Sequence, residues 1–239
     1  MAKILVSGLI NLETTLKVDQ FPIHYSPVRY PFFGARTTVS GVGYNISKAL
    51  LTLGDQVEFL SLIGKDTIGD LVRATLLREG IPDQDILAIL ENTAQSVILY
   101  DEQGKRQINV DLKNIQERQY PLELFLDRLA GCDLAALCNI NFSRAFLAPA
   151  RQSGCQVATD VHTIANLDDA YNREFMAAAN ILFLSHENLE TSPERLAQDA
   201  LQRFGNDLIV IGLGSSGALL AVKEDHFIGR FPAVQTRPM

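Results

Sequence analysis

Two polar side chains follow the first apolar run of the sequence. Residues 3–8 (KILVSG) are typical of a short buried strand that ends in glycine, and Asn11 and Glu13 come shortly after it. In open α/β sheets, ligands bind at the carboxyl ends of the strands. Because Asn11 and Glu13 alternate by two positions, both can point to one side, where an amide and a carboxylate suit the hydroxyls of a polyol. The alternative interpretation is a turn residue, Asn11, followed by a solvated one, Glu13.

A glycine-rich segment, residues 40–45 (SGVGYN), precedes a helical pattern. Glycines let the backbone approach a ligand closely, and the start of a helix offers N–H groups without partners. The segment is not G-x-G-x-x-G and does not follow the first strand directly, so a Rossmann dinucleotide site is not favoured. A tight turn is the alternative interpretation, and Asn45 could equally be the N-cap of the helix.

Two further segments connect elements where a ligand could bind. Asp66 follows an apolar strand pattern and is best interpreted as a helix N-cap. Residues 214–217 (GSSG) join two strands. This segment is either a hairpin turn or a backbone bed for a nucleotide.

These segments need a scaffold, and the chain predicts one of alternating strands and helices. Such alternation is typical of βαβ units and of a mostly parallel sheet covered by helices on both faces. The expected strands are 3–8, 57–63, 134–137, 156–159, 181–184, 208–212 and 218–222. The expected helices are 45–53, 66–79, 122–130, 144–153, 167–178 and 193–204.

Two segments, 14–39 and 97–112, lie outside this alternation and have an amphipathic β pattern. We expect them to pair as a small sheet, a β-lid, over the main domain. The predicted core domain is therefore made of residues 1–13, 40–96 and 113–239, and the lid of residues 14–39 and 97–112.

Composition limits the classes of partner. The 239 residues carry 21 Lys and Arg against 28 Asp and Glu, a formal net charge of −7, which argues against nucleic acid or an anionic membrane as partner. Three cysteines without a C-x-x-C pair indicate neither a disulfide framework nor a zinc site, and they favour a cytoplasmic location. No signal peptide or long apolar stretch is recognisable. We expect a small-molecule substrate.

The order of the motifs is more specific than any one of them. A strand is followed by N-x-E, SGVGYN opens a helix ending in Leu-Gly, and G-x-D-x-x-G opens another ending in Gly-Ile. The hairpin loop DEQGKR and the segment IVIGLGSSGALLAV come later. In this order the chain resembles the ribokinase-like sugar kinase family, often called PfkB, over nearly its whole length. The resemblance implies a ribokinase-like α/β fold and an ATP-dependent kinase that uses Mg²⁺ to phosphorylate a sugar hydroxyl.

The resemblance also implies roles for individual residues. Its substrate-binding positions map onto Asn11, Glu13, Gly41, Val42, Gly43, Asn45 and Asn139. Its nucleotide-binding positions map onto Glu187, Gly214, Ser215 and Gly217. The family's β-lid closes over substrate and often dimerises, so a homodimer through the lid is a further hypothesis.

The chain departs from the family pattern at five places, of which four concern single residues or a short motif. Ser40 replaces the first glycine of the substrate loop, and Val42 replaces a lysine, which counts against a ribose-like binding pattern. Gly212 replaces the threonine that precedes the nucleotide turn. After residues 181–184 no asparagine stands three positions before a glutamate, so the N-x-x-E motif linked to magnesium and phosphate is not matched.

The largest departure is the second signature, D-T-x-G-A-G-D, which carries the catalytic base and does not occur in this sequence. The resemblance places that base beyond Met239, so we predict no catalytic residue within the chain. We also expect a bare sheet face on which residues such as Ile209 and Ile211 could be exposed.

Three functions therefore remain open. The first is a sugar kinase whose catalytic C-terminal segment is missing from this chain. The others are a non-catalytic sugar or nucleoside binder on a degenerate kinase scaffold, and a nucleoside kinase.

Overall fold

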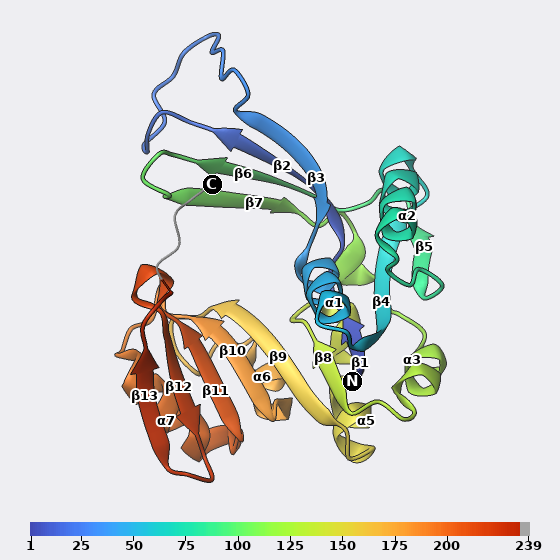
Figure 1. Ribbon diagram of the computed structural model, residues 1–239, viewed down its shortest axis with the longest axis vertical. Coiled ribbons are helices and arrows are strands. Elements are labelled where there is room, and N and C mark those ends of the chain that lie inside the picture. The colour runs from blue at the N-terminus through green and yellow to red at the C-terminus, as the bar shows by residue number, and fades with distance from the viewer. Residues whose placement is uncertain (235–239) are drawn as a thin grey trace. The chain divides into compact units, whose positions relative to one another are not determined.

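The computed structural model describes residues 1–234, which form two compact units (Figure 1). The first unit contains Val6–Tyr120. The second contains Ala2–Leu5 and the described chain from Pro121 to residue 234. Strand β1 (Lys3–Ser7) contributes residues to both units.

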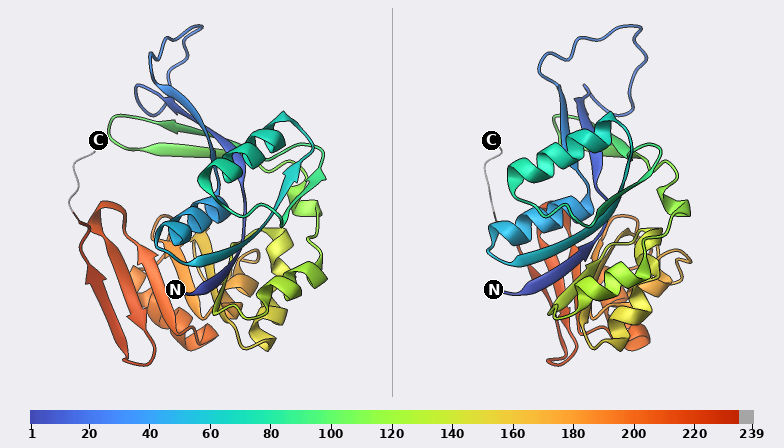
Figure 2. Two further views of the ribbon diagram at one scale, coloured as in Figure 1. Left: turned by 45° about the vertical axis from the view of Figure 1, so that its right-hand side comes forward. Right: turned by 90° about the vertical axis from the view of Figure 1, so that its right-hand side faces the viewer.

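The first unit includes a separate four-stranded sheet in the order β3-β2-β6-β7. Strands β2 and β6 are parallel, and the other two pairs are antiparallel. The strands are β2 (Asn11–Lys17), β3 (Ala35–Ser40), β6 (Gln95–Tyr100) and β7 (Arg106–Asp111). The loop between β2 and β3 extends beyond the ends of these strands (Figure 2). A second small sheet was predicted and is confirmed.

The rest of the first unit surrounds β4, a strand buried along most of its length. Strand β4 lies between β1 and the parallel strand β5, and α1 packs on it. The Asp66 carboxylate accepts a 2.9 Å hydrogen bond from the N–H of Gly69 and so caps α2, as predicted. The elements are α1 (Val42–Thr52), β4 (Gln56–Gly64), α2 (Thr67–Glu79), β5 (Ile86–Leu90) and the 3₁₀ turn η1 (Ile115–Glu117).

The second unit holds a sheet in the order β13-β12-β11-β10-β9-β8. Its strands are β8 (Leu134–Leu137), β9 (Gln156–Thr163), β10 (Ile181–Ser185), β11 (Leu208–Gly212), β12 (Ala218–Val222) and β13 (Phe227–Phe231). Strands β8 to β11 are parallel, whereas β12 and β13 return antiparallel. The predicted α/β class with a mostly parallel sheet is thereby confirmed.

Five helices and one 3₁₀ turn accompany this sheet: α3 (Leu122–Leu129), α4 (Asn141–Arg144), α5 (Leu147–Gln152), α6 (Arg173–Ala178), α7 (Pro193–Phe204) and η2 (Gly214–Ser216). Helix α7 has the expected bounds because its ends are specified locally. Ser192 accepts a hydrogen bond from the N–H of Arg195, Pro193 is the first helical residue, and Gly205 ends the helix in the left-handed conformation.

Two helix predictions were wrong. Of the segment expected as one helix, 144–153, only Leu147–Gln152 forms a helix, α5, while Arg144 ends the separate helix α4. Pro149 has no N–H with which to bond the backbone oxygen of residue 145, so the two helices do not join. The segment expected as a helix at 167–178 is helical only from Arg173. Before it, side chains of Asn166 and Asp169 accept hydrogen bonds from backbone N–H groups two or three residues later, which competes with helix formation.

The expected exposure of Ile209 and Ile211 was also wrong, since both are fully buried. Alternate residues of β11 face opposite sides of the sheet, and α7 packs on β11 and β12. The buried residues of that helix, Leu196, Ala197 and Ala200, supply an apolar surface for this side. Within residues 1–234, no helix is both long enough and apolar enough to cross a membrane.

Candidate functional site

Asn11 begins strand β2 and is almost completely buried, with 3% of its surface exposed. The turn interpretation of Asn11 was therefore wrong. Its side-chain Nδ2 donates a 3.1 Å hydrogen bond to Oγ of Ser96. Its Oδ1 has no hydrogen-bond partner among the described residues. A buried carbonyl oxygen without a partner is costly, and a ligand hydroxyl that donates to it would remove that cost.

Further polar groups stand close to Asn11 in the small sheet. Ser40 is its direct partner across the β2–β3 pair. Asn45 donates from its Nδ2 to Oγ of Ser40 over 3.5 Å. Glu13, half-buried, lies two residues further along β2, paired with Thr38 on one side and Ser96 on the other. Amide, hydroxyl and carboxylate groups in this arrangement suit a polyhydroxy ligand.

The glycine loop brings the start of α1 next to this polar row. Gly41 has a φ of +111°, and a Cβ on it would lie 2.5 Å from the carbonyl oxygen of Leu9. A Cβ on Gly43 would lie 2.7 Å from the carbonyl carbon of Gly8. The N–H of Gly43 donates to the Leu9 oxygen at 3.0 Å. The loop therefore packs directly on the backbone between β1 and β2, which explains both glycines.

Val42 and Asn45 occupy the first turn of α1. Val42 is its half-buried first residue, and Gly41 is the N-cap, without a side-chain capping bond. The suggestion that Asn45 is the N-cap was wrong, since the helix begins three residues before it. Its exposed side chain is instead free to bond Ser40.

A polar cluster ties α1 to α2. The buried Tyr44 hydroxyl donates to Oε2 of Glu79, and the Lys48 ammonium lies 3.0 Å from the same carboxylate. The hydrogen bond from Tyr44 lowers the pKa of Glu79 below its usual value, despite the opposing effect of burial, and Lys48 adds to the lowering. Burial, reinforced by Glu79, raises the pKa of Tyr44. The cluster holds the helix that carries the glycine loop.

Other buried side-chain oxygens also lack partners among the described residues, namely Ser61 Oγ and Asn206 Oδ1. The amide nitrogen of Asn206 donates to the backbone oxygens of Met176 and Ala179, so that side chain joins the loop after α7 to the end of α6. An unpartnered oxygen alone does not make a site. Asn11 differs because it stands beside Ser40 and the glycine loop.

In the second unit, the predicted residues lie at the carboxyl ends of parallel strands. Asn139 follows β8 and is half-buried. Its Nδ2 donates to Oδ1 of Asn172 at 2.9 Å, and its backbone oxygen accepts from the Tyr171 hydroxyl at 3.0 Å.

Glu187 follows β10, with an exposed side chain. The preceding residue, His186, bonds the backbone oxygen of Gly212 through its N–H and through Nδ1, both at 2.9 Å. The end of β10 is thereby joined to the end of β11. A Cβ on Gly214 would lie 3.9 Å from the His186 ring, so the ring stands against the predicted nucleotide turn.

The predicted nucleotide turn, Gly214 to Gly217, is held by local backbone hydrogen bonds. The N–H groups of Ser216 and Gly217 bond the backbone oxygens of Leu213 and Gly214. A Cβ on Gly217 would lie 2.0 Å from the Phe231 oxygen, so this glycine, with a φ of +99°, is required by packing against β13. These contacts support the hairpin-turn interpretation. Ser215 is exposed and offers its hydroxyl to solvent or a ligand.

Sequence reasoning did not single out Asp160 and His162 at the end of β9. The N–H of His162 donates to Oδ1 of Asp160 at 2.8 Å, and its Nδ1 lies 3.4 Å from Oδ2. The Asp160 carboxylate raises the pKa of the His162 imidazole above its usual value. His162 also has a φ of +56°, which is uncommon for a residue with a side chain. The sequence did carry a signal for these two residues, because they follow the buried residues of a strand.

No group of three or more His, Cys, Asp or Glu side chains that could hold a metal ion occurs in residues 1–234. Mg²⁺ in nucleotide sites usually takes one or two carboxylates and completes its shell with phosphates and water. The exposed carboxylate of Glu187, just beyond the end of β10, fits the role of one such ligand. The catalytic base expected beyond Met239 lies outside the described residues.

The predicted residues thus fall into two groups. Asn11, Glu13, Gly41, Val42, Gly43 and Asn45 lie close together within the first unit. The others, Asn139, Glu187, Gly214, Ser215 and Gly217, lie in the second unit.

Two curated relatives match most of this chain. The chain is 26% identical over 234 residues to the acarbose 7(IV)-phosphotransferase of an Actinoplanes species, covering 97% of this chain and 76% of that protein. It is 26% identical over 226 residues to the ATP-dependent ribose-1-phosphate kinase of Halopiger xanaduensis, covering 91% of this chain and 73% of that protein.

The fold has solved counterparts. A microbiome-derived acarbose kinase superimposes with a TM-score of 0.84 at 22% identity, covering 98% of this chain and 77% of that one. Residues 1–237 match the family model described as pfkB family carbohydrate kinase. The chain belongs to the pfkB family of carbohydrate kinases.

Proposed function

We propose that this protein binds a sugar or sugar derivative through its first unit and acts as an ATP-dependent kinase that phosphorylates a sugar hydroxyl. The observation that carries the proposal is the buried Asn11, whose Oδ1 has no partner among the described residues and faces no competing donor there. Family membership and the sugar-directed names of both curated relatives support the same substrate class.

The acceptor is held by groups of complementary type. Asn11 Oδ1 and the Glu13 carboxylate accept hydrogen bonds from sugar hydroxyls. Ser40 and Asn45 can donate as well as accept, and the loop of Gly41, Val42 and Gly43 lets the backbone approach the ring. Charge-assisted bonds to Glu13 are the stronger ones in this set.

ATP and Mg²⁺ are the expected co-substrate and metal. Ser215, with Gly214 and Gly217, supports the nucleotide, and Glu187 supplies a carboxylate for Mg²⁺ together with the phosphates. Bound Mg²⁺ neutralises developing charge on the phosphoryl group during transfer. The residues of this chain bind and orient the sugar and the nucleotide. Since this sequence contains no G-A-G-D, a non-catalytic carbohydrate binder is the second candidate function.

We also propose a cytoplasmic location and a homodimer through the small sheet. Three cysteines without a C-x-x-C pair support a reducing compartment. The outer strands β3 and β7 of the small sheet have an unpaired edge in the described chain, and edges of this kind favour pairing with another chain. Tyr25, Tyr30, Phe32 and Phe33 are strongly exposed in the loop between β2 and β3.

The test is a panel of acceptors: acarbose, maltose, D-ribose, ribose 1-phosphate, adenosine and inosine. Binding is measured by calorimetry, and phosphoryl transfer by ADP release from ATP with Mg²⁺. Carbohydrate binding with carbohydrate-dependent ADP release supports the kinase. Carbohydrate binding without ADP release supports the non-catalytic binder, and binding of nucleosides alone supports a nucleoside kinase.

A further inference from the structure

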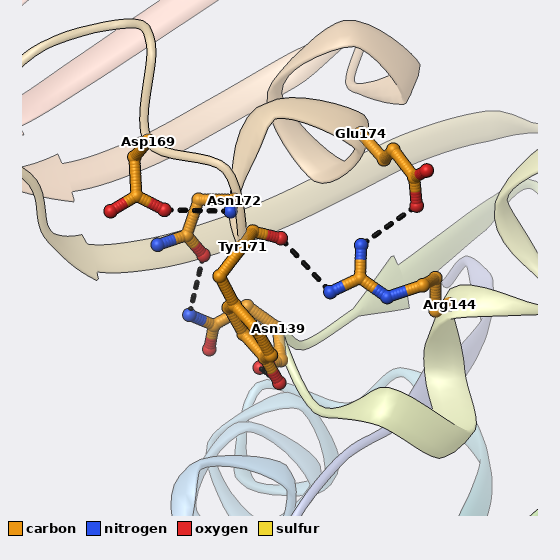
Figure 3. Close-up of polar contacts among 6 residues, drawn as sticks. All are labelled: Asn139, Arg144, Asp169, Tyr171, Asn172 and Glu174. Atoms are coloured by element: carbon orange, nitrogen blue, oxygen red, sulfur yellow. Dashed lines mark hydrogen bonds and ion pairs between the residues drawn. The ribbon is translucent and has the colours of Figure 1, made fainter.

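Asn139 is held at two points by one short segment of the second unit (Figure 3). Its side-chain Nδ2 donates to Oδ1 of Asn172 at 2.9 Å. Its backbone oxygen accepts from the Tyr171 hydroxyl at 3.0 Å. Both the main chain and the side chain of Asn139 are therefore fixed by residues 32 and 33 positions later.

The segment that holds Asn139 is itself anchored by Arg144. One guanidinium nitrogen donates to the backbone oxygen of Tyr171 at 2.9 Å, and another donates to Glu174 at 2.7 Å. The guanidinium carbon also lies 4.8 Å from the ring centres of both Tyr171 and Phe175. Two hydrogen bonds from one guanidinium, together with its close approach to aromatic rings, use the geometry that distinguishes arginine from lysine.

Asp169 fixes the other side of the segment. Its Oδ1 accepts from the N–H of Asn172 at 2.8 Å, and Asn172 is 7% exposed. A buried residue with its main chain held in this way has little freedom to turn its side chain. Its Oδ1 is thereby presented to Asn139, as Figure 3 shows.

The bond to Asn172 determines which end of the Asn139 amide remains available. An asparagine side chain has two donors on nitrogen and an acceptor on oxygen. Because Asn139 Nδ2 donates to Asn172 Oδ1, the Oδ1 of Asn139 points away from Asn172. No described residue donates a hydrogen bond to Asn139 Oδ1. The amide therefore offers an acceptor at the carboxyl end of β8, rather than alternating between its two orientations.

We propose that Tyr171 and Asn172 are positioning residues that hold Asn139 so that its Oδ1 accepts a hydrogen bond from a hydroxyl of a carbohydrate bound at the carboxyl end of β8. Arg144 acts indirectly, because it fixes the segment that carries Tyr171 and Asn172. This inference rests on the proposed function, since it takes the substrate to be a carbohydrate.

The first measurement needs no ligand. In amide NMR spectra of the isotope-labelled chain, the Asn139 side-chain NH₂ should exchange slowly. Asn172→Ala should shift its resonances and speed its exchange. Asn172→Asp keeps an acceptor oxygen in place and should retain slow exchange. Equal exchange rates in the wild type and Asn172→Ala would contradict the positioning contact.

The second measurement is a double-mutant cycle on affinity, with the tightest binder among acarbose, maltose, D-ribose and ribose 1-phosphate as probe. Asn139→Ala should weaken binding about tenfold, the effect of losing about 1.4 kcal/mol from one hydrogen bond. Asn172→Ala should weaken binding by a similar factor. The double variant should bind no more weakly than either single variant. Tyr171→Phe, which removes only the hydroxyl, should weaken binding while the variant keeps the fold of the wild type.

Two arginine variants provide a matched pair. Arg144→Met should weaken binding, whereas Arg203→Met should not, although Arg203 also forms an exposed ion pair, with Asp168 at 2.7 Å. Additive losses in the cycle, or a loss in Asn139→Ala with none in Asn172→Ala and Tyr171→Phe, would overturn the positioning role. Failure of all four carbohydrates to bind the wild type would instead overturn the proposed function and, with it, the substrate contact of Asn139.

Discussion

Asn11 donates its side-chain hydrogen bond to Ser96 over 3.1 Å and keeps its own carbonyl oxygen buried, with no partner in the described chain. The two residues belong to the adjacent parallel strands β2 and β6. The bond sets the orientation of the amide, because the nitrogen is committed to Ser96. The small sheet therefore presents an acceptor next to the glycine loop.

Replacement of Asn11 by leucine should change stability little. The variant loses one hydrogen bond, worth about 0.5–1.5 kcal/mol, but it also removes a buried oxygen without a partner. We expect the free energy of unfolding to fall by less than about 1 kcal/mol in urea titrations. Asn206→Leu is the matched control, because it frees the backbone oxygens of Met176 and Ala179 and should cost about 1–3 kcal/mol. Equal losses would show that Asn11 is only a structural residue.

Gly41→Ala should be more destabilising than Gly54→Ala. Both glycines have positive φ, +111° and +91°, so an added Cβ strains the backbone at each by about 1–3 kcal/mol. Only at Gly41 would that Cβ also collide with backbone, at 2.5 Å from the Leu9 oxygen, whereas Gly54 has open space. Thermal melts of both variants measure the difference. A smaller loss for Gly41→Ala would show that the loop is not packed on the β1–β2 backbone.

The stability contributed by Asp66 should depend on pH. Burial raises the pKa of its carboxyl, but hydrogen bonds from Thr93 and from backbone N–H groups outweigh that effect, so the folded-state pKa is lowered. The contribution is therefore fully present above the unfolded-state pKa of about 3.9, and it is lost as pH falls through the folded-state pKa.

Asp66→Asn tests this dependence, because asparagine also caps helices but lacks the charge. Wild type should be more stable at pH 7 by about 1 kcal/mol, and the difference should shrink below about pH 4. Urea titrations at pH 7, 5, 4 and 3 measure it. A difference that stays constant over this range would contradict a role for the charge.

Phe32→Ala should weaken self-association or closure of the small sheet over substrate. Phe32 is 83% exposed, in the same loop as Tyr25, Tyr30 and Phe33. Sedimentation and carbohydrate affinity are the two measurements. Phe183→Ala, at an exposed phenylalanine of the second unit, should alter neither. If Phe32→Ala also leaves both unchanged, this segment does not act as a lid or dimer contact.

The elements that the sequence predicted best have their ends fixed by neighbouring residues. Helix α7 has Ser192 and Pro193 at its start and Gly205 at its end, and strand β11 matches its short apolar run. Residues 167–172 resemble a helix in composition, but side-chain bonds of Asn166 and Asp169 to nearby backbone form turns there instead.

The sequence could suggest which residues form the candidate site, but not how their side-chain amides are oriented. The types and spacing of Asn11, Gly41 and Asn45 pointed to a polyol site in the first unit. The bond of Asn11 to Ser96, 85 residues away, and that of Asn139 to Asn172, 33 residues away, come from tertiary packing, which spacing along the chain does not encode. Those two bonds determine which atom of each amide remains available.

The central claim is that Asn11 Oδ1 receives a carbohydrate hydroxyl. Calorimetric titration of wild type and Asn11→Leu with the tightest-binding carbohydrate of the panel tests it most directly. We expect binding at least about tenfold weaker in the variant, the effect of losing one hydrogen bond of about 1.4 kcal/mol, with unchanged unfolding behaviour. Equal affinity of the two proteins for that carbohydrate would contradict the claim.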